Sequence, residues 1–336
     1  MTILVTGGTG YIGSHTCVAL LEAGHDVVIL DNLSNSSREV VGHIEALGGR
    51  PVQFFEGDMR DPKILADVFA AQPAAVIHFA ALKAAPESFG KPLEYYDNNI
   101  GGTLALLKAM RAAGCKTMVF SSSATVYGAE NPVPFREDMP IGRAANPYGA
   151  TKIMIEQILR DLAAAEPDWS VCLLRYFNPV GAHPSGLIGD NPTIPHNIVP
   201  ILSEVVLGKR PELIVTGNDF DTPDGTCLRD YIHILDLVDG HLLALERAAK
   251  TAGCEAFNLG TGKGLSVLEL IAAFEAATGV KVPWRFGPRR PGNIDIAACY
   301  ADTAKAREVL GFACKRGAKE MCEDHWRFLG NLRRGG

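Results

Sequence analysis

Tyr148 and Lys152 stand four positions apart in a stretch that opens with Asn146 and Pro147, a pair typical of a helix start. Four-residue spacing puts both side chains on one face of that helix. A tyrosine proton normally leaves at about pH 10, so a phenolate at neutral pH costs roughly 4 kcal/mol. An ammonium about 5 Å away, at an effective dielectric constant of about 20, supplies roughly 3 kcal/mol of this. The pair therefore predicts a general base that works near neutral pH, the alternative being an exposed tyrosine beside a solvated lysine.

A run of three serines, Ser121, Ser122 and Ser123, ends the strand predicted before this helix. Open α/β sheets place their ligands at the carboxyl ends of strands, which is where Ser123 falls. Its hydroxyl can pass a proton between a substrate hydroxyl and Tyr148. For Ser121 and Ser122 we favour the simpler interpretation, that of ordinary turn serines.

A glycine-rich segment, Thr6 to Gly13, follows the first predicted strand and contains G-x-G-x-x-G. Any side chain on Gly7, Gly10 or Gly13 would hold the backbone away from a pyrophosphate, whose charge is met by free N–H groups and the positive end of the next helix. The segment therefore predicts a dinucleotide site, with a tight strand-to-helix turn as the alternative.

Two acidic residues end the next two predicted strands. Asp31 stands eighteen residues after Gly13, near the spacing at which a carboxylate accepts hydrogen bonds from the adenosine ribose hydroxyls. It would repel a 2′-phosphate, so the sequence favours NAD over NADP, and an oxidised nicotinamide would add positive charge beside Tyr148. Asp58 is a candidate acceptor for the adenine amino group, although a helix N-cap region explains it nearly as well.

Short β-branched runs alternate with helix-like stretches from residue 2 to about 175, which predicts a parallel sheet covered on both faces. After Asn178 the alternation weakens, and proline and glycine become dense. We therefore expect an α/β protein with a Rossmann-like, doubly wound parallel sheet over residues 1–177 and a smaller, less regular substrate domain over residues 178–336. Whether the chain crosses back between the two stays open. The predicted strands are Ile3–Val5, Val27–Leu30, Val52–Phe55, Val76–Phe79, Met118–Phe120 and Val171–Leu174.

Composition excludes several classes of protein. The chain has 336 residues, 47% hydrophobic and 21% charged, and a net charge of -6 without blocks of like charge, which argues against disorder and against nucleic-acid binding. No apolar run is long enough to span a membrane, and no secretory signal opens the chain, so we expect a cytoplasmic protein. Eight cysteines scattered without metal-ligand spacing predict reduced thiols and no metal.

Several longer motifs resemble the UDP-glucose 4-epimerases, a family of extended short-chain dehydrogenase/reductases. The resemblance covers nearly the whole chain. The matching segments are Thr6–Gly13, Phe79–Lys83, Tyr95–Asn99, Ser121–Gly128, Tyr148 with Lys152, Leu174–Gly186 and Arg229–His233.

Carried over by motif, the resemblance implies two sets of site residues. The residues expected to hold NAD are Gly7, Gly10, Tyr11, Ile12, Gly13, Asp31, Asn32, Leu33, Ser34, Asn35, Ser36, Asp58, Met59, Phe79, Ala80, Ala81, Lys83, Asn98, Ser123, Tyr148, Lys152 and Phe177. Those expected to face a UDP-sugar are Ser123, Tyr148, Asn178, Asn197, Ile198, Thr216, Arg229, Tyr231, Arg290, Asp295 and Cys299. Tyr148, Lys152 and Ser123 would be catalytic.

The chain departs from the family pattern at three places. Thr216 stands where the family often has an aromatic residue that stacks on uracil, which puts base affinity in question. Asn293 and Ile294 resemble an insertion before Asp295, so Asp295 is the expected ribose-binding acid, with Asn293 as second choice. The loop from residue 186 to 197 is one residue shorter than usual.

The resemblance implies NAD-dependent interconversion of UDP-galactose and UDP-glucose through a transient 4-keto sugar. A 4,6-dehydratase would need ionisable residues where Ala124 and Thr125 stand, and a non-catalytic NAD sensor would have no use for the Tyr148 and Lys152 pair. Cys299 aligns with the position beside the sugar C2 substituent, so its small size extends the expected substrates to the N-acetylhexosamine pair. The family also implies a homodimer through helices near residues 93–112 and 153–164.

Overall fold

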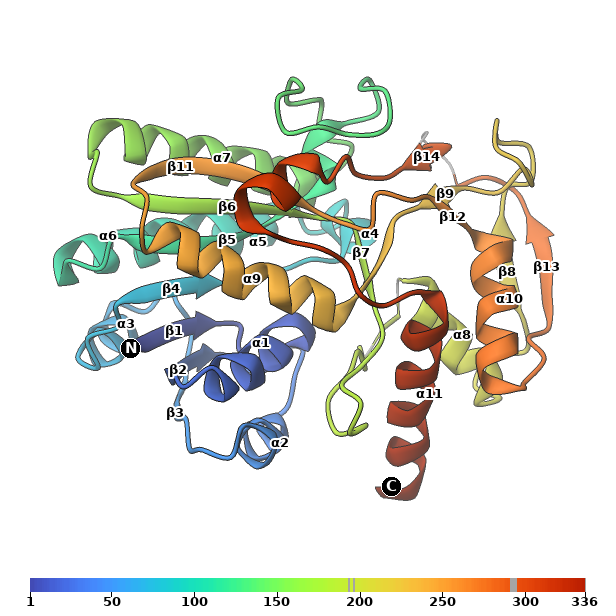
Figure 1. Cartoon of the computed structure of the whole chain (residues 1–336), viewed down its shortest axis with the longest axis horizontal. Helices are drawn as coiled ribbons and strands as arrows, with labels where there is room; N and C mark the ends of the chain where they lie inside the picture. The colour runs from blue at the N-terminus through green and yellow to red at the C-terminus, as the bar shows by residue number, and fades with distance from the viewer. Residues whose placement is uncertain (193, 196, 291–294, 336) are drawn as a thin grey trace.

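The computed structural model describes residues 1–192, 194–195, 197–290 and 295–335, and a parallel sheet of seven strands forms the centre of this part of the chain (Figure 1). Adjacent strands all pair in parallel, in the order β11-β6-β5-β4-β1-β2-β3. The strands are β1 (Thr2–Thr6), β2 (Asp26–Asp31), β3 (Gln53–Glu56), β4 (Ala75–His78), β5 (Thr117–Ser123), β6 (Ser170–Tyr176) and β11 (Gly253–Leu259). The fold class predicted from the sequence is confirmed.

Successive strand residues supply two separate cores, one on each face of the sheet. In β1, Ile3 and Val5 belong to one buried cluster and Leu4 belongs to the other. The first cluster packs under α1 (Tyr11–Glu22), α2 (Glu39–Gly48) and α9 (Ile234–Ala248). The second packs under α3 (Pro62–Phe69), α6 (Gly102–Ala113) and α7 (Pro147–Ala165). Because both faces are covered, the strands are apolar throughout rather than alternating.

The chain crosses back to the sheet after it has entered the second unit. Strand β11 pairs with β6, and α9 packs on the same face as α1. A single boundary at residue 178 is therefore too simple, because α9 and β11 lie with the sheet and not with the second unit. The first three residues of β11, Gly253 to Glu255, are only partly buried, which is why the strand lacks the continuous apolar run of the others.

The C-terminal unit combines helices with small sheets (Figure 1). Its core contains Leu202, Val215, Phe274 and Met321. The pairs are β7 (Asn178–Val180) with β10 (Tyr231–His233), and β8 (Leu213–Thr216) with β13 (Trp284–Gly287). A third sheet has the order β12 (Leu265–Ser266), β9 (Leu228–Arg229) and β14 (Ala298–Cys299), and the helices are α8 (Ile198–Val206), α10 (Val267–Thr278) and α11 (Ala318–Gly335).

A predicted helix over residues 93–112 contains a π-helical turn. It consists of α5 (Pro92–Tyr96), the turn η1 (Asp97–Gly101) and α6, which follow one another without a break. Strand β3 begins one residue later than predicted. Another π-helical turn is η4 (Ala306–Leu310).

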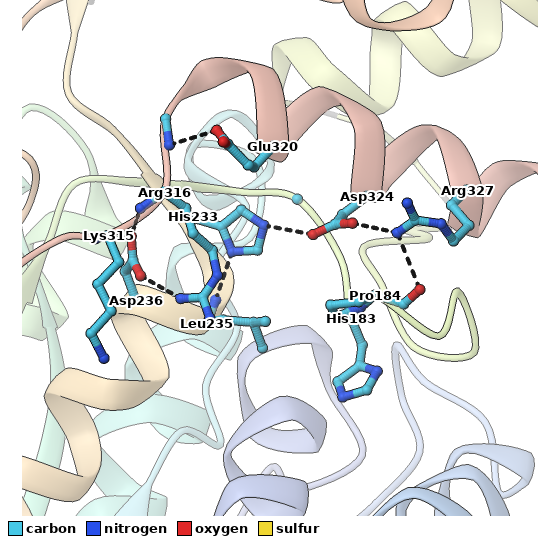
Figure 2. A network of polar contacts seen from close by, with 12 residues as sticks. His183, Pro184, His233, Leu235, Asp236, Lys315, Arg316, Glu320, Asp324 and Arg327 are labelled. Atoms are coloured by element: carbon cyan, nitrogen blue, oxygen red, sulfur yellow. Dashed lines mark hydrogen bonds and ion pairs between the residues drawn. The ribbon is translucent and has the colours of Figure 1, made fainter.

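A polar network fastens α11 to the start of α9 (Figure 2). Nδ1 of His233 accepts a hydrogen bond from the Leu235 backbone N–H at 3.1 Å, and Nε2 lies 3.3 Å from Asp324 of α11. Because Nδ1 is an acceptor, the ring proton sits on Nε2. Buried Asp236 accepts both the backbone N–H of Arg316, at 3.0 Å, and its guanidinium, at 2.5 Å. The C-terminal helix is thereby held against a helix of the central sheet.

Candidate functional site

The predicted cofactor residues gather along the carboxyl edge of the central sheet. Parallel strands all end at the same edge, so the segments that follow them meet there. Asn98 lies in η1, and Tyr148 and Lys152 lie on α7. The remaining segments are Gly7–Gly13 after β1, Asp31–Ser36 at the end of β2, Asp58 and Met59 after β3, Phe79–Lys83 after β4, Ser123 at the end of β5 and Phe177 after β6.

The loop between β1 and α1 has no room for side chains at two of its glycines. Gly7 has a φ of +71°, and a Cβ there would lie 2.7 Å from the backbone nitrogen of Ala80. A Cβ on Gly13 would lie 2.1 Å from the carbonyl oxygen of Gly7. Gly10 is the N-cap of α1 and offers no capping side chain, so the positive end of the helix faces the loop. This is the geometry that a bound pyrophosphate requires.

Asp31 is fastened at the end of β2 by its own loop. Its carboxylate accepts backbone N–H groups from Thr9 at 3.1 Å and from Leu33 at 2.9 Å. Leu33 has a φ of +56°, a left-handed conformation that is rare for a residue other than glycine. The carboxylate therefore has a defined place beside the glycine loop. Asp58 does not cap the next helix, since Asp61 does so by accepting the Lys63 N–H.

Asn99 is a structural residue at this edge that the sequence did not reveal, since the sequence predicts a role only for its neighbour Asn98. The buried Asn99 amide accepts from the Leu82 N–H at 2.8 Å and donates to the Leu82 carbonyl and the Thr151 hydroxyl, both at 3.0 Å. It thereby ties the segment after β4 to the first turns of α7. The π-helical turn sets its direction, and a regular helical period does not reveal such a turn.

Tyr148 and Lys152 both lie on α7, as their spacing predicts. The Asn146 side chain accepts the Gly149 N–H at 2.8 Å, so the helix starts where the sequence indicates. Lys152 is buried, its ammonium nitrogen donates to the Ser121 carbonyl at 2.5 Å, and it lies 5.8 Å from the centre of the Tyr148 ring. Ser123 accepts the Thr125 N–H at 3.2 Å at the start of the turn η2 (Ala124–Tyr127).

Burial dominates the ionisation of this pair. It raises the pKa of Tyr148 to about 12, although a hydrogen bond from Ser123 acts in the opposite direction. It lowers the pKa of Lys152 to about 7, and the charge of Glu156 opposes that fall. The sequence-based balance omitted the desolvation of both groups. These residues alone leave Tyr148 protonated at neutral pH, so its ionisation needs a further positive charge nearby.

Two of the predicted substrate residues lie side by side on neighbouring strands. Cys299 of β14 is in register with Arg229 of β9. The Arg229 guanidinium donates to the carbonyls of Leu228, at 2.8 Å, and Ile296, at 2.9 Å. Cys299 packs against the apolar cluster that contains Ala124 of η2, so this strand borders the turn after Ser123.

The other predicted substrate residues are spread over the second unit. Arg290 and Asp295 form a bidentate ion pair, with Nε to Oδ2 at 2.9 Å. Asn293 lies outside the described residues. In the rest, Asn178 of β7 is in register with Tyr231 of β10, Asn197 is the N-cap of α8, Ile198 is its first residue and Thr216 ends β8.

Asp230, between Arg229 and Tyr231, is a second residue whose role the sequence did not reveal. Its buried carboxylate accepts the backbone N–H groups of Thr261 at 2.7 Å, Gly262 at 3.0 Å and Ala301 at 3.1 Å. Burial raises the pKa of Asp230 against these hydrogen bonds. It therefore ties its own segment to the loop at Thr261 and Gly262 and to Ala301, beside the two neighbours that were predicted to meet substrate.

Comparison with known proteins decides the family. A model of the NAD dependent epimerase/dehydratase family matches residues 3–260. The chain belongs to this family. It is 56% identical to the UDP-glucose 4-epimerase of Bacillus subtilis (strain 168) over 330 residues, 98% of this chain and 96% of the relative. This confirms the resemblance seen in the sequence.

Solved structures agree with this assignment. The UDP-glucose 4-epimerase of Bifidobacterium longum, in complex with NAD+ and UDP, has a TM-score of 0.95 at 47% identity, covering 100% of both chains. The UDP-Glc/GlcNAc 4-epimerase of Campylobacter jejuni has a TM-score of 0.85 at 34% identity, covering 98% of this chain and 99% of that one.

No helix in the described ranges is long and apolar enough to cross a membrane. Within the same ranges, no group of three or more His, Cys, Asp or Glu side chains is arranged to hold a metal ion.

The crowding at Gly13 predicts a specific loss of cofactor. Gly13→Ala is expected to weaken NAD binding at least tenfold, about 1.4 kcal/mol, because the new methyl group must push the loop open. Gly42→Ala on α2 is the matched control, since a Cβ there meets no atom within 4 Å. Calorimetric titration of both folded variants with NAD checks this, and equal affinities would contradict it.

Proposed function

We propose that this protein interconverts UDP-galactose and UDP-glucose, using NAD and a transient 4-keto sugar. The observation that carries the proposal is the placing of Tyr148 and Lys152 beside Ser123 at the carboxyl edge of a dinucleotide-binding sheet. The NAD dependent epimerase/dehydratase family match and the UDP-glucose 4-epimerase relatives support the same reaction.

The residues at the sheet edge fit NAD. Gly7 and Gly13 let the backbone after β1 pack closely on itself and on Ala80, as a pyrophosphate-binding turn requires, and Asp31 presents a fixed carboxylate where an adenosine ribose would end. When bound, NAD supplies the hydride acceptor on its nicotinamide ring. Its positive charge is of the kind that the ionisation of Tyr148 needs.

Tyr148 then acts as the base. Its phenolate takes the proton of the sugar C4 hydroxyl, with Ser123 as the relay, while the Lys152 ammonium stabilises the phenolate. The C4–H bond breaks with loss of a hydride, which leaves a 4-keto sugar. The 4-keto sugar then rotates within the site. The hydride returns to the opposite face of C4, and Tyr148 gives the proton back to the C4 oxygen. The sugar regains both the hydride and the proton that it gave up, so neither NAD nor any other reactant is consumed.

Two arginines in the second unit suit the nucleotide diphosphate. Arg229 is held by two backbone carbonyls, and Arg290 is held by Asp295, so each guanidinium has a defined direction. A planar guanidinium matches phosphate oxygens, which a protein of net charge -6 must meet with local cations. We assign the UDP group to this side of the site.

Removing the base tests the reaction. Tyr148→Phe is expected to fold and keep NAD but to lose nearly all epimerase activity, because only the phenolic oxygen is deleted. Tyr96→Phe on α5 is the control that removes a hydroxyl outside the proposed site. Conversion of UDP-galactose by the purified protein measures both, and Tyr148→Phe keeping more than about a tenth of the rate, a cost of only about 1.4 kcal/mol, would show that another group moves the proton.

We also propose that the protein accepts the UDP-N-acetylhexosamine pair. Cys299 has a small side chain. It packs against the apolar cluster that contains Ala124, in the turn after Ser123, and it is in register with Arg229 on the neighbouring strand. Burial raises the pKa of its thiol to about 11, so it is a neutral group at physiological pH. A relative whose structure is described as a UDP-Glc/GlcNAc 4-epimerase shares the fold over nearly its full length.

The size of residue 299 is the test. Cys299→Tyr is expected to lower the rate on UDP-N-acetylglucosamine at least tenfold relative to UDP-galactose, because the ring fills the space that an acetamido group needs. Cys299→Ser, which keeps the size, should retain both rates. A wild-type protein inactive on the N-acetylated sugars, or an unchanged ratio in Cys299→Tyr, would place the selectivity elsewhere.

We propose that the protein is located in the cytoplasm, which the scattered cysteines favour. We also propose that it forms a homodimer through neighbouring helices. Helices α4 (Ala85–Ser88) and α5 pack on α7, and exposed apolar side chains lie on or beside this group. They are Phe89 at 51% exposure, Leu93 at 77%, Leu104 at 37% and Met154 at 45%. Sedimentation should give twice the chain mass, and Leu93→Lys should shift the protein to the monomer, whereas a monomeric wild type would refute the dimer.

A further inference from the structure

Glu156 occupies a special place on α7, one helical turn beyond Lys152. Tyr148, Lys152 and Glu156 are spaced by four residues, so they share the face that packs on the sheet. Glu156 is only 2% exposed, which is unusual for a carboxylate. No sequence motif singles it out, and it stands outside the residues assigned to cofactor or substrate.

Three side chains bind the Glu156 carboxylate from both sides. The Ser122 hydroxyl donates to Oε1 at 2.6 Å. Buried Arg175 donates from Nε to Oε1 at 3.0 Å and from Nη2 to Oε2 at 2.7 Å. Arg160, one turn further on and partly exposed, reaches Oε2 at 3.5 Å. These donors lower the pKa of Glu156, so the carboxylate is ionised, and each of its two oxygens accepts two hydrogen bonds.

These contacts tie the helix to the ends of two strands. Ser122 of β5 and Arg175 of β6 are direct partners in the parallel ladder. The residue before Ser122 is Ser121, whose carbonyl accepts the Lys152 ammonium, and the residue after it is Ser123. One carboxylate thus sets how α7 sits against the strand end that carries the relay serine.

Glu156 also acts on the charge of Lys152. Burial favours the neutral amine, and the negative charge of Glu156 is what opposes it. The other titratable groups around Lys152 and Glu156 include Tyr148 and Arg160 on α7, His78 on β4, Tyr176 and Arg175 on β6, Tyr95 on α5, and Cys254 on β11, whose thiol is neutral because burial raises its pKa to about 11. Of these, His78 is neutral, since burial and the nearby Lys152 lower its pKa to about 3, and burial raises the pKa of both Tyr95 and Tyr176, so neither supplies a negative charge.

On the basis of the function proposed above, we propose that Glu156 is a positioning residue for the proton transfer at Tyr148. It holds the second turn of α7 on the ends of β5 and β6 and keeps the Lys152 ammonium charged. A charged Lys152 stabilises the phenolate that takes the sugar proton, while a neutral amine does not. Glu156 touches neither sugar nor cofactor and acts through Lys152.

The alternative is that Glu156 only neutralises Arg175. Replacing one member of a buried ion pair leaves the other charge unpaired and destabilises the fold, whereas replacing both with uncharged side chains of similar volume is often tolerated. The double variant Glu156→Gln with Arg175→Met therefore separates the two roles. Arg175→Met alone keeps the carboxylate next to Lys152, and Asp161→Asn removes an exposed carboxylate from the same helix.

The pH dependence of kcat for UDP-galactose conversion is the readout. In the double variant we expect the alkaline limb to move about one unit toward lower pH, because Lys152 loses its proton more easily, and kcat at neutral pH to fall about tenfold. KM should stay within about twofold, since no substrate contact changes. Arg175→Met and Asp161→Asn should keep the limb where it is or move it to higher pH.

Each outcome decides between the two roles. A folded double variant whose pH profile overlays that of the wild type shows that Glu156 serves only the fold. If that double variant does not fold, Glu156→Gln with Arg175→Gln takes its place, and an unchanged profile leads to the same conclusion, whereas a limb moved to lower pH supports the positioning role of Glu156. Tyr148→Phe, measured in parallel, separates the hypotheses, because activity in that variant would refute the proposed base and leave the Glu156 contacts unaffected.

Discussion

All strands of the central sheet run in one direction, so their carboxyl ends meet at one edge. The segments that follow the strands can therefore bring the polar groups for a dinucleotide together at that edge. Gly7 and Phe79 directly follow two of the strands, Asp31 and Ser123 end two others, and all four reach the same edge although they are far apart in the chain. The two apolar cores keep this edge in place, since each strand is locked between helices on both faces. The precision of the site is therefore a property of the sheet.

The second unit depends on the first through backbone and charge. The return of α9 and β11 to the sheet fixes the position of β10, which leads directly into α9. Tyr11 of the glycine loop donates its hydroxyl to the Gly181 carbonyl at 2.7 Å, and His233 reaches Asp324 of α11. The predicted substrate residues are thus supported by the same sheet whose carboxyl edge carries the predicted NAD residues.

Much of this could be predicted because it is encoded locally. Mostly apolar runs of three or four residues indicate six of the seven strands, and the glycines between Thr6 and Gly13 indicate a backbone that must approach a phosphate. What escaped prediction depends on partners distant in sequence. Asn99 and Asp230 are polar residues whose hydrogen bonds come from other segments. Burial likewise acts on the ionisation of Tyr148 and Lys152, and spacing alone carries no information about it.

The π-helical turn between α5 and α6 makes this helix sensitive to its length. Such a turn holds one residue more than the α-helical turn that it replaces, so deleting a residue within Asp97–Gly101 would restore a regular helix. Because the turn accommodates that extra residue locally, the deletion would leave α5 and α6 in their present phase and change the directions of the side chains within the turn. Asn99 would then leave Leu82 and Thr151 although its own side chain was intact. A one-residue deletion in this turn would therefore separate the segment after β4 from α7 while the side chains that join them are all still present.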